Sequence, residues 1–464
     1  MKIKNIFLIF TLSTVSLNTL SLSSVNLLAV PADSSALGAE VVPVDWKHFD
    51  KSFKNNKDIN ESRRMLANAA RYNLAWIVKT FKEDNQHGLY GMDHYNENGV
   101  RPAASVCYGM AVALKCANLN NKELEIPRDM AFQRMAMLIK GVASGYKANR
   151  SDGKGWGDGW QTALWATLVG QGGWMLWDKL DAETHKMVQT LVIDEADRFI
   201  APGYKVPYWT APDGHVNTPG DTKAEENAWN ATILQLAVAM MPHHPHIERW
   251  KHICSELMIS AFSLKSDLQN DKIVDGKPVR DWLHGFNVRD DGAVINHNII
   301  HPDYTTTITT NARTFLMQSL AGEPVSEAAQ WNAPFIYRSL VEHRWPAPPY
   351  KLPGGAMYIP GKAEVYYPQG TDWSKYRFDV YYVIDVNAHL LGWDKGLKHK
   401  AGDWMRIRAG RILAMQARHS DGHMFTHEEY STYPGCEQMV ILKTADAYLL
   451  FWLHAHHQIA HSRQ

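Results

Sequence analysis

The chain has 464 residues, and its 48 basic and 48 acidic side chains give a formal net charge of zero. This balance gives no sign of the basic surface that nucleic-acid binding requires, so we expect no nucleic-acid partner. Its 17 Trp and 19 Tyr residues are unusually many, which indicates a large core and also a cleft where sugar rings stack on aromatic side chains.

The N-terminal segment has the composition of an export signal. Two lysines precede an apolar, Ser/Thr-rich run over residues 6–28, and small residues follow at Ala32 and Ala39. The run contains too many hydroxyl groups for a good membrane span, and no cysteine nearby marks a lipid anchor. We therefore expect residues 1–32 to be a signal peptide, with cleavage as late as residue 39 as the alternative. The mature protein is then exported, periplasmic or secreted, without a membrane anchor.

Helical periodicity dominates the rest of the chain. Residues 61–82 carry apolar side chains at the spacing of one helical face. Asp181 is the expected N-cap of one helix, and Met241-Pro242 is the expected end of another. The twelve predicted helices cover 61–82, 102–117, 127–147, 159–178, 182–198, 223–241, 246–264, 305–321, 326–342, 376–391, 402–418 and 439–457.

The connections between these helices alternate between short and long. The long ones, 83–101, 199–222, 265–304 and 343–375, are rich in Gly, Pro, Tyr and His. Short turns at one end and long loops at the other are typical of an (α/α) toroid with its active site among the long loops. We predict an all-α protein in which residues 40–464 form one toroid catalytic domain of six or seven helical hairpins. A superhelical repeat array is the alternative, although no fixed sequence period supports it.

Two stretches place a Gly-Asp turn at the start of a predicted helix. They are residues 155–161 (GWGDGWQ) and residues 220–230 (GDTKAEENAWN). Helix capping accounts for Asp158 and Asp221. The first turns of such helices would face a glycan bound at a toroid mouth, so we expect Trp160 to contact the substrate.

Helix capping does not account for the polar residues deeper in the second helix. Asn227 and Asn230 are three apart, on neighbouring positions of one helical face, and Asn is a mediocre helix former. Two of them beside Trp229 indicate that these side chains have a function that needs polar groups. We expect Asn227 to be catalytic and Asn230 and Trp229 to bind the substrate.

The strongest pattern lies at residues 291–304 (DGAVINHNIIHPDY), before a predicted helix that opens at Thr305. This run resembles the toroidal lyases that act on hyaluronan and chondroitin, which carry Asp-Gly-Ser-aromatic-x-polar-His followed within ten residues by Tyr. In those enzymes the Tyr takes and returns a proton and the His assists at the uronate. The resemblance implies that Tyr304 is the catalytic base and acid and that His297 assists it.

The resemblance also implies an Asn and an Arg at the substrate carboxylate. Asn227 is the best upstream match, and Arg338 or Arg344 is the candidate arginine. The chain departs from the pattern, because Ala293 replaces the Ser, the His–Tyr gap is shorter, and the appended β-sandwich domains are missing. Its single-domain build is more similar to compact gut-bacterial toroid lyases that act on alginate or glucuronan, or that remove rhamnose capping glucuronate.

These residue types suit β-elimination at a uronate. The enzyme removes the weakly acidic C5 proton and breaks the bond at C4, so it must stabilise the charge that develops on the carboxylate. Asn, His and Arg donors do so, and a Tyr near cations ionises more easily than free Tyr, whose pKa is about 10. We predict a polysaccharide lyase, a carbon–oxygen lyase, acting on an acidic polysaccharide or oligosaccharide without a metal or other cofactor.

Two other classes of function remain open. An (α/α) glycoside hydrolase of unsaturated uronates would need a carboxylic acid, for which Asp158, Asp221 and Glu226 are candidates. A non-catalytic glycan-binding protein would bind a uronan without producing new chain ends. Ultraviolet absorbance separates these classes, because a lyase creates an unsaturated uronate and such a hydrolase destroys it.

Two further segments, an aromatic one and a histidine-rich one, have more than one possible role. Residues 358–382, rich in Tyr and turn residues, predict either a rim that stacks sugars or a packed Ω-loop. The three histidines at 243, 244 and 246 stand at a predicted helix end, where cationic His is favourable. Their spacing matches no tetrahedral metal signature, so we expect no metal there.

Overall fold

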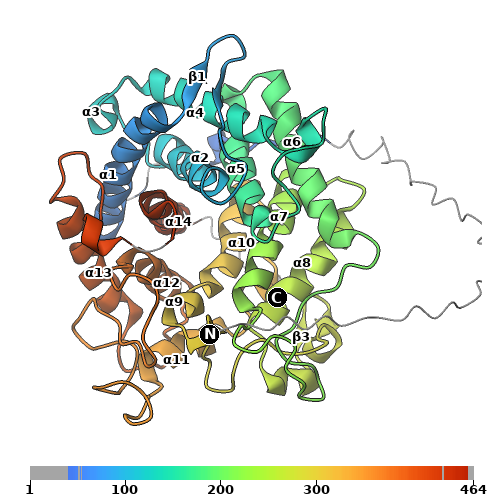
Figure 1. The fold of residues 1–464 in the computed structure, drawn as a ribbon, viewed down its shortest axis with the longest axis vertical. Coiled ribbons are helices and arrows are strands. Elements are labelled where there is room, and N and C mark those ends of the chain that lie inside the picture. Colours follow the sequence, from blue (N-terminus) through green and yellow to red (C-terminus); the bar gives the residue numbers. More distant parts are fainter. Residues whose placement is uncertain (1–39, 51–52, 54, 431–432, 458–464) are drawn as a thin grey trace, which may run out of the picture. The chain divides into compact units, whose positions relative to one another are not determined.

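The computed structural model describes residues 40–50, 53, 55–430 and 433–457. The predicted signal peptide, with both of its expected cleavage sites, lies outside these residues. The described chain is mostly helical (Figure 1), and its sheets are small antiparallel pairs. No helix in these ranges combines the length and apolar character needed to cross a membrane. The strand pairs are β1 (Lys82–Asp84) with β2 (Leu89–Gly91), β3 (Ile273–Val274) with β4 (Lys277–Pro278), and β5 (Ile295–Asn296) with β6 (Ile299–Ile300).

Every predicted helical run overlaps an observed helix, so the all-α prediction is confirmed. Asp181 accepts a hydrogen bond from the Thr184 amide at 2.7 Å, as expected of an N-cap. Two one-turn helices were not predicted, α3 (Asn121–Leu124) and α9 (Pro302–Thr305). The longer helices are α1 (Lys57–Thr80), α2 (Val100–Lys115), α4 (Arg128–Ser144), α5 (Thr162–Met175), α6 (Ala182–Asp197), α7 (Ala224–Met240), α8 (Ile247–Ala261), α10 (Ile308–Ala321), α11 (Ala333–Glu342), α12 (Phe378–Leu391), α13 (Ala401–Gln416) and α14 (Cys436–Ala455).

The longer helices alternate in burial along the chain. In α2 every residue from Val100 to Leu114 is buried, and α5, α7, α10, α12 and α14 are buried almost as completely. In α1, by contrast, the buried residues follow one face, as Met65, Leu66 and Ala69 do. A helix that is apolar on all sides belongs inside a protein, whereas an amphipathic helix covers it. Amphipathic helices therefore alternate with internal ones.

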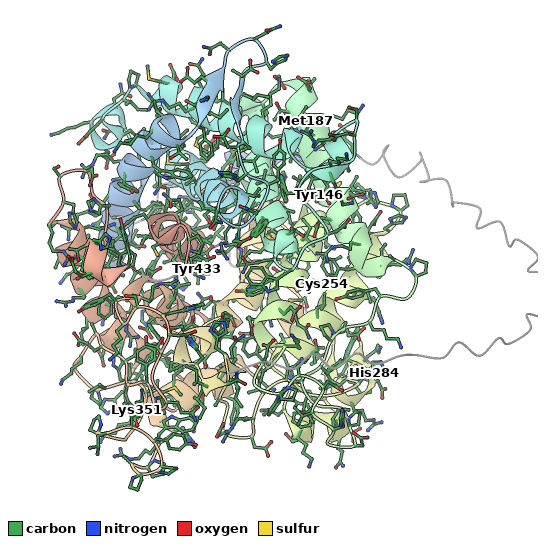
Figure 2. All side chains as sticks on the ribbon, viewed as in Figure 1. Tyr146, Met187, Cys254, His284, Lys351 and Tyr433 are labelled. Atoms are coloured by element: carbon green, nitrogen blue, oxygen red, sulfur yellow. The ribbon has the colours of Figure 1, made fainter. Side chains whose placement is uncertain are left out.

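The internal helices contact one another in a closed order. Helix α14 packs on α2, α2 on α5, α5 on α7, and α7 on α10, while α12 contacts both α10 and α14. The last helix thus lies beside the first two, as the dark red α14 and the blue α1 in Figure 1 show. Side chains occupy the space between the ribbons (Figure 2). Segments far apart in the sequence therefore share one continuous core.

Buried ion pairs join the internal helices to one another and to their neighbours. Arg313 of α10 pairs with Asp446 of α14 and donates to Gln171 of α5 at 2.6 Å. Arg408 of α13 pairs with Asp385 of α12, and neither side chain is exposed. Because a buried charge without a partner is very unfavourable, each pair depends on both of its helices being in place.

Candidate active site

A tight hairpin presents His297 at its tip. Strands β5 and β6 are joined by the two-residue turn His297–Asn298, and both residues have positive φ values, 52° and 63°. Two positive φ values are the signature of the type I′ turn that matches the twist of a hairpin, and His and Asn tolerate this conformation better than most residues. The turn leaves the side chain of His297 43% exposed, accessible to a ligand.

One carboxylate connects two imidazoles at this hairpin. Oδ2 of Asp372 accepts a hydrogen bond from Nδ1 of His297 at 2.6 Å, and its Oδ1 accepts one from Nε2 of His301 at 3.1 Å. Burial would raise the pKa of Asp372, but the hydrogen bonds from the two histidines outweigh it and hold that pKa below its usual range. His301 is fully buried, and burial lowers its pKa. We call His297, His301, Tyr304 and Asp372 the His–Asp–Tyr cluster.

Tyr304, in α9, places its hydroxyl 3.5 Å from Nε2 of His297. Its ring packs against Trp373, with 4.9 Å between the centroids, and only 7% of the residue is exposed. Burial raises the pKa of Tyr304 well above its usual value, and the carboxylates of Glu225 and Asp372 raise it further. The expectation that nearby cations ease the ionisation of Tyr304 is therefore wrong for the protein without substrate, because carboxylates dominate its surroundings.

The hairpin is tied to the start of α7. The side-chain amide of Asn296 donates to Asp221 at 3.1 Å and to Glu225. The backbone N–H of Asn298 donates to the carbonyl of Gly220 at 3.0 Å. A Cβ at position 220 would lie 2.0 Å from Oδ1 of Asn298, so only glycine allows this approach. The two stretches at 220–230 and 291–304 are thus held together through backbone and side-chain contacts.

Glu225 is the most perturbed acid at this junction. Burial raises its pKa well above the usual range, and its Oε2 has no hydrogen-bond partner among the described residues. Burial therefore disfavours the charged form of this side chain. The sequence did not distinguish Glu225 from Glu226, because burial cannot be read from a run of two glutamates.

The structure places Asn227 differently from the sequence expectation. Asn227 is fully buried, and its amide donates to the Pro207 carbonyl and to Oγ of Ser260, both at 2.9 Å. These bonds tie α7 to α8 and to the preceding loop, and they leave no exposed surface for a substrate. Asn230 is 8% exposed, and its Oδ1 has no partner among the described residues. Oδ1 of Asn227 also has no partner among the described residues, so the two asparagines differ in burial and in the bonds that the Asn227 amide makes.

The predicted caps at Asp158 and Asp221 are wrong. Helix α5 begins after Gln161 and helix α7 after Lys223, and neither start has a side-chain cap. A non-helical segment separates each Gly-Asp turn from the helix that follows, so each helix begins too far along the chain for the Asp to cap it. Asp158 instead pairs with Lys147 at 3.4 Å, and Asp221 pairs with Lys223 at 2.9 Å.

The predicted arginines do not lie in the cluster. Arg338 pairs with Glu342 at 3.8 Å on the exposed face of α11, and Arg344 is exposed in the loop that follows. The arginines beside the cluster are buried ones. The guanidinium of Arg377 lies 5.5 Å from the ring centroid of Trp373, and that of Arg101 lies 3.8 Å from the ring of Tyr433. Neither arginine belongs to a recognisable motif, so the sequence carried no signal for them.

Trp373 borders the cluster, and a separate aromatic pair is formed by Trp160 and Trp229. Trp373 contacts the rings of both histidines and of Tyr433. Trp160 is 56% exposed and meets the ring of Trp229 edge-on, with 5.2 Å between the centroids. Trp229 itself is buried and supports Trp160. An exposed Trp on a buried Trp is a suitable platform for a sugar ring.

The segment at 358–382 is packed like an Ω-loop in one part and reaches the cluster in another. Tyr358, Tyr366 and Tyr367 are buried, as in a packed loop. The segment also contributes Asp372 and Trp373 to the cluster, and Oε1 of Gln369 accepts from the Ile300 amide at 2.6 Å. Packing of the tyrosines therefore holds the part of the loop that reaches the hairpin.

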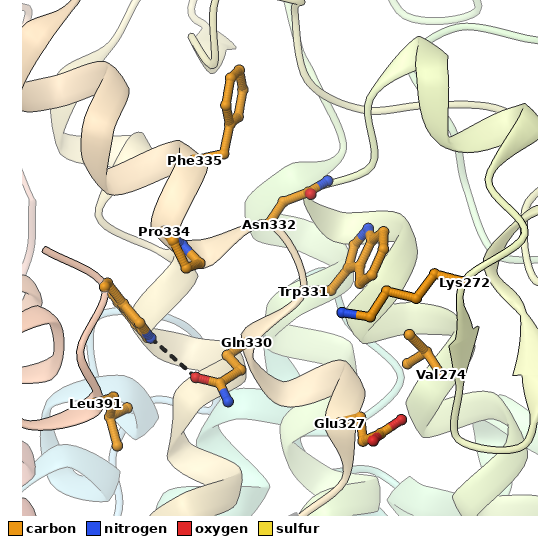
Figure 3. Close-up of a pocket in the computed structure, with 10 residues that line it drawn as sticks. Lys272, Val274, Glu327, Gln330, Trp331, Asn332, Pro334, Phe335 and Leu391 are labelled. Carbon is orange, nitrogen blue, oxygen red and sulfur yellow. Dashed lines mark hydrogen bonds between the residues drawn. The ribbon is translucent and has the colours of Figure 1, made fainter. Parts of the chain in front are cut away.

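A cavity of about 500 Å³ is lined by residues outside this cluster (Figure 3). Its walls come from the segments around Lys272, from Glu327 to Phe335, and from Leu391 to Trp393. The ammonium of Lys272 lies 5.3 Å from the ring of Trp331. No cluster residue lines this cavity, and it contains no grouping of proton-transfer residues comparable to the hairpin.

The His–Asp–Tyr cluster thus combines an exposed imidazole, a protonated phenol, a shared carboxylate and an aromatic border. Such an arrangement is suited to moving protons at a bound sugar. Comparison with protein-family models, with curated proteins and with solved structures finds no match to this chain.

Proposed function

We propose that the protein is a polysaccharide lyase that cleaves a uronate-containing glycan, such as alginate or glucuronan, by β-elimination. The single observation that carries this proposal is the row formed by the Tyr304 hydroxyl, the His297 imidazole and the Asp372 carboxylate, with His297 accessible. A Tyr that exchanges protons beside an oriented His is what removal of a C5 proton requires.

We also propose that residues 40–464 form an (α/α)6 toroid. The alternation of internal and amphipathic helices along the chain supports it, as does the closed order of contacts from α2 to α14. In such a fold the long connections gather at one end. The cluster is built from two of them, 265–304 and 343–375, and the hairpin that carries His297 contacts the start of α7 through Asn296.

The proposed reaction assigns both proton transfers to Tyr304. Its oxygen takes the C5 proton, the C4–O bond breaks, a C4=C5 double bond forms, and the same proton passes to the departing oxygen. His297 faces the phenol oxygen with Nε2 while its Nδ1–H donates to Asp372, so Nε2 accepts the Tyr304 proton, and the N–H of the imidazolium that results donates to the tyrosinate. This donor offsets the burial and the carboxylates that disfavour the ionised form of Tyr304.

The test is a screen of uronic-acid polymers with the mature protein, followed by ultraviolet absorbance. Alginate, glucuronan and a rhamnose-capped glucuronate oligosaccharide are the first substrates, and neutral glucans are the controls. We expect absorbance from the C4=C5 bond to rise with at least one uronan and with no neutral glucan. New reducing ends that form without this absorbance would show hydrolysis in place of elimination.

Glu225 favours a second candidate, a hydrolase of unsaturated uronates. A buried carboxyl with a raised pKa is suited to act as a general acid, and Glu225 shares the amide of Asn296 with Asp221. The other carboxylates considered fit less well, since Asp158 pairs with Lys147 and Glu226 with Lys223. This hydrolase would remove the absorbance of an unsaturated disaccharide, and Glu225→Gln would abolish that activity.

The remaining alternatives are separated by the same screen. A non-catalytic glycan-binding protein would retain a uronan on an affinity matrix and change no absorbance. Export to the periplasm or the medium is also a proposal, based on the composition of residues 1–32, and N-terminal sequencing of the mature protein tests it. A first residue at 33 or 40 is the expected result.

A further inference from the structure

The surroundings of the cluster are acidic, although its proposed substrate is an anion. Four carboxyl groups, those of Asp221, Glu225, Asp303 and Asp372, lie in or against it. Each cationic side chain that adjoins it already has a partner, although Nη1 of Arg377 and Nε of Arg101 are buried without a hydrogen bond among the described residues. Lys223 pairs with Asp221 and Glu226, Arg377 with Asp379, and Arg101 stacks on Tyr433. A uronate carboxylate would therefore lack a free positive partner among the described side chains.

We propose that His297, His301 and Asp372 bind one divalent cation of the zinc class, with Nδ1 of His297 and Nε2 of His301 as the nitrogen ligands. The three ligand atoms lie within 4.8 Å of one another. Metal–nitrogen distances of about 2.0–2.1 Å place neighbouring ligands in a tetrahedral zinc site roughly 3.3 Å apart. Judged against that spacing, the carboxylate–imidazole contacts of 2.6 and 3.1 Å would widen by about 0.7 and 0.2 Å, and ligand atoms as much as 4.8 Å apart would approach by up to about 1.5 Å.

His301, the buried ligand, has a carboxylate behind its ring, as metal-binding histidines usually do. Nδ1 of His301 faces Oδ2 of Asp303 at 3.5 Å, and neither atom has a hydrogen-bond partner among the described residues. A cation on Nε2 leaves the imidazole proton on Nδ1, where it can be donated to Asp303. The other oxygen of Asp303 accepts from the hydroxyl of Tyr367 at 3.2 Å. A carboxylate behind the histidine orients the ring toward the metal.

The outward side of the three ligands is open. The side chains of His297 and Asp372 are 43% and 49% exposed, whereas His301 is fully buried. Three protein ligands with one open position are typical of catalytic zinc sites, in which the open position binds water or substrate. The cation would supply the charge that a substrate carboxylate needs. This role rests on the proposed function, whereas metal binding does not.

The experiment is a zinc titration of tag-free mature protein after treatment with a chelator. Calorimetry and competition with a chromophoric chelator should give one Zn²⁺ per chain. His301→Ala should abolish this binding. Because His301 is buried, His297→Asn is the second variant, since Asn keeps the positive φ of the turn and removes the imidazole. Asp303→Asn should weaken binding by about 10- to 100-fold, as the loss of an orienting carboxylate does.

His87→Ala is the matched control. His87 and Asp84 form an exposed His–carboxylate pair at 2.8 Å, but the pair has no third ligand within reach in the described chain. We expect this variant to bind zinc as the unmodified protein does. Equal binding by the His297→Asn, His301→Ala and unmodified proteins would overturn the proposal, and so would the absence of one-to-one binding.

Activity on uronans is measured separately, with and without chelator. Zinc bound at one per chain without cleavage of any uronan would leave the metal site standing and remove the proposed lyase function. Undiminished elimination by chelator-treated, zinc-free protein would leave the lyase function standing and remove the role of the metal at the substrate carboxylate, while the titration alone decides whether the metal site exists. Loss of elimination with chelator, restored by Zn²⁺, would support both.

Discussion

Tyr304 contributes one hydroxyl group to the proposed chemistry. Tyr304→Phe removes that group and keeps the ring that packs on Trp373. We expect kcat to fall by about 100- to 10,000-fold, the usual contribution of a general acid–base group, with substrate binding nearly unchanged. Steady-state kinetics and far-ultraviolet dichroism measure the two effects. Tyr95→Phe, at an exposed tyrosine, is the control. A folded Tyr304→Phe protein that keeps about a third of the activity would eliminate Tyr304 as the base.

The pH dependence of the reaction follows from the same hydroxyl. Burial, with Glu225 and Asp372, raises the pKa of Tyr304 above its ordinary value of 10.0. Little Tyr304 is therefore ionised near neutral pH, and the ionised fraction grows about tenfold for each pH unit. If Tyr304 is the base, kcat/KM measured at constant ionic strength should rise steadily up to roughly pH 10 without a plateau. A plateau near neutral pH would assign the proton abstraction to another group.

At the scale of elements, the hairpin depends on the close approach of Gly220. Gly220→Ala would place a methyl group against Asn298 in a backbone conformation with φ of 78°. We expect the hairpin to shift and kcat/KM to fall by on the order of 10- to 100-fold, because small misplacements of catalytic groups are costly. Activity and thermal unfolding should be measured together.

Gly203→Ala is the matched control for that substitution. Gly203 has a similar positive φ of 88°, but no atom lies within 4 Å of a Cβ built there. Both substitutions strain the backbone, whereas only Gly220→Ala creates a clash. Equal activity of the two variants would show that the hairpin does not need this contact.

The pair between α12 and α13 is expected to be a large stability determinant. Arg408→Leu leaves Asp385 buried with only the hydroxyls of Tyr337 and Tyr358, each at 3.0 Å. We expect the free energy of unfolding to fall by about 3–5 kcal/mol, as for other broken buried pairs. Denaturant unfolding measures it, and adding Asp385→Leu should recover part of the loss.

The exposed pair on α11 provides the comparison. Arg338 and Glu342 lie 3.8 Å apart with exposed side chains, so Arg338→Leu should change the free energy of unfolding by less than about 1 kcal/mol. If the two Arg→Leu variants lose the same stability, the pair at Arg408 is not the determinant.

For the whole molecule, the closed order of helix contacts predicts cooperative unfolding. Helix α14 packs on α1, α2, α10 and α12, so removing residues 436–464 would expose buried faces of helices from both ends of the chain. We expect the shortened chain to lose its cooperative thermal transition in calorimetry, while the mature protein unfolds in one transition. A shortened chain that unfolds cooperatively near the original Tm would contradict the closed order.

Local patterns in the sequence were sufficient to predict the helices. Apolar spacing and the cap at Asp181 depend on residues within a few turns of one another, and each predicted run overlaps a helix. The errors arise where a distant segment intervenes. Asp221 resembles a cap but bonds Asn296, 75 residues away, and Asn227 resembles a substrate ligand but bonds Ser260 of the next helix.

The cluster shows the same division between local and distant information. His297 and Tyr304 stand seven residues apart and could be selected from one stretch of sequence, and their roles remain predictions. Asp372, Trp373 and Arg377 come from the 358–382 segment some 70 residues later, which the sequence marked as a sugar-stacking rim or a packed Ω-loop without predicting that these three side chains meet His297 and Tyr304.

By itself, the amino-acid sequence determined the helical class, the order of the helices and one neighbouring His–Tyr pair, because hydrophobic periodicity and short motifs act over a few residues. Only the tertiary structure decided which carboxylate holds the histidines, which asparagine is buried, and how the phenol is charged. Burial and electrostatic interactions depend on distances in space, and the packing of far segments sets those distances.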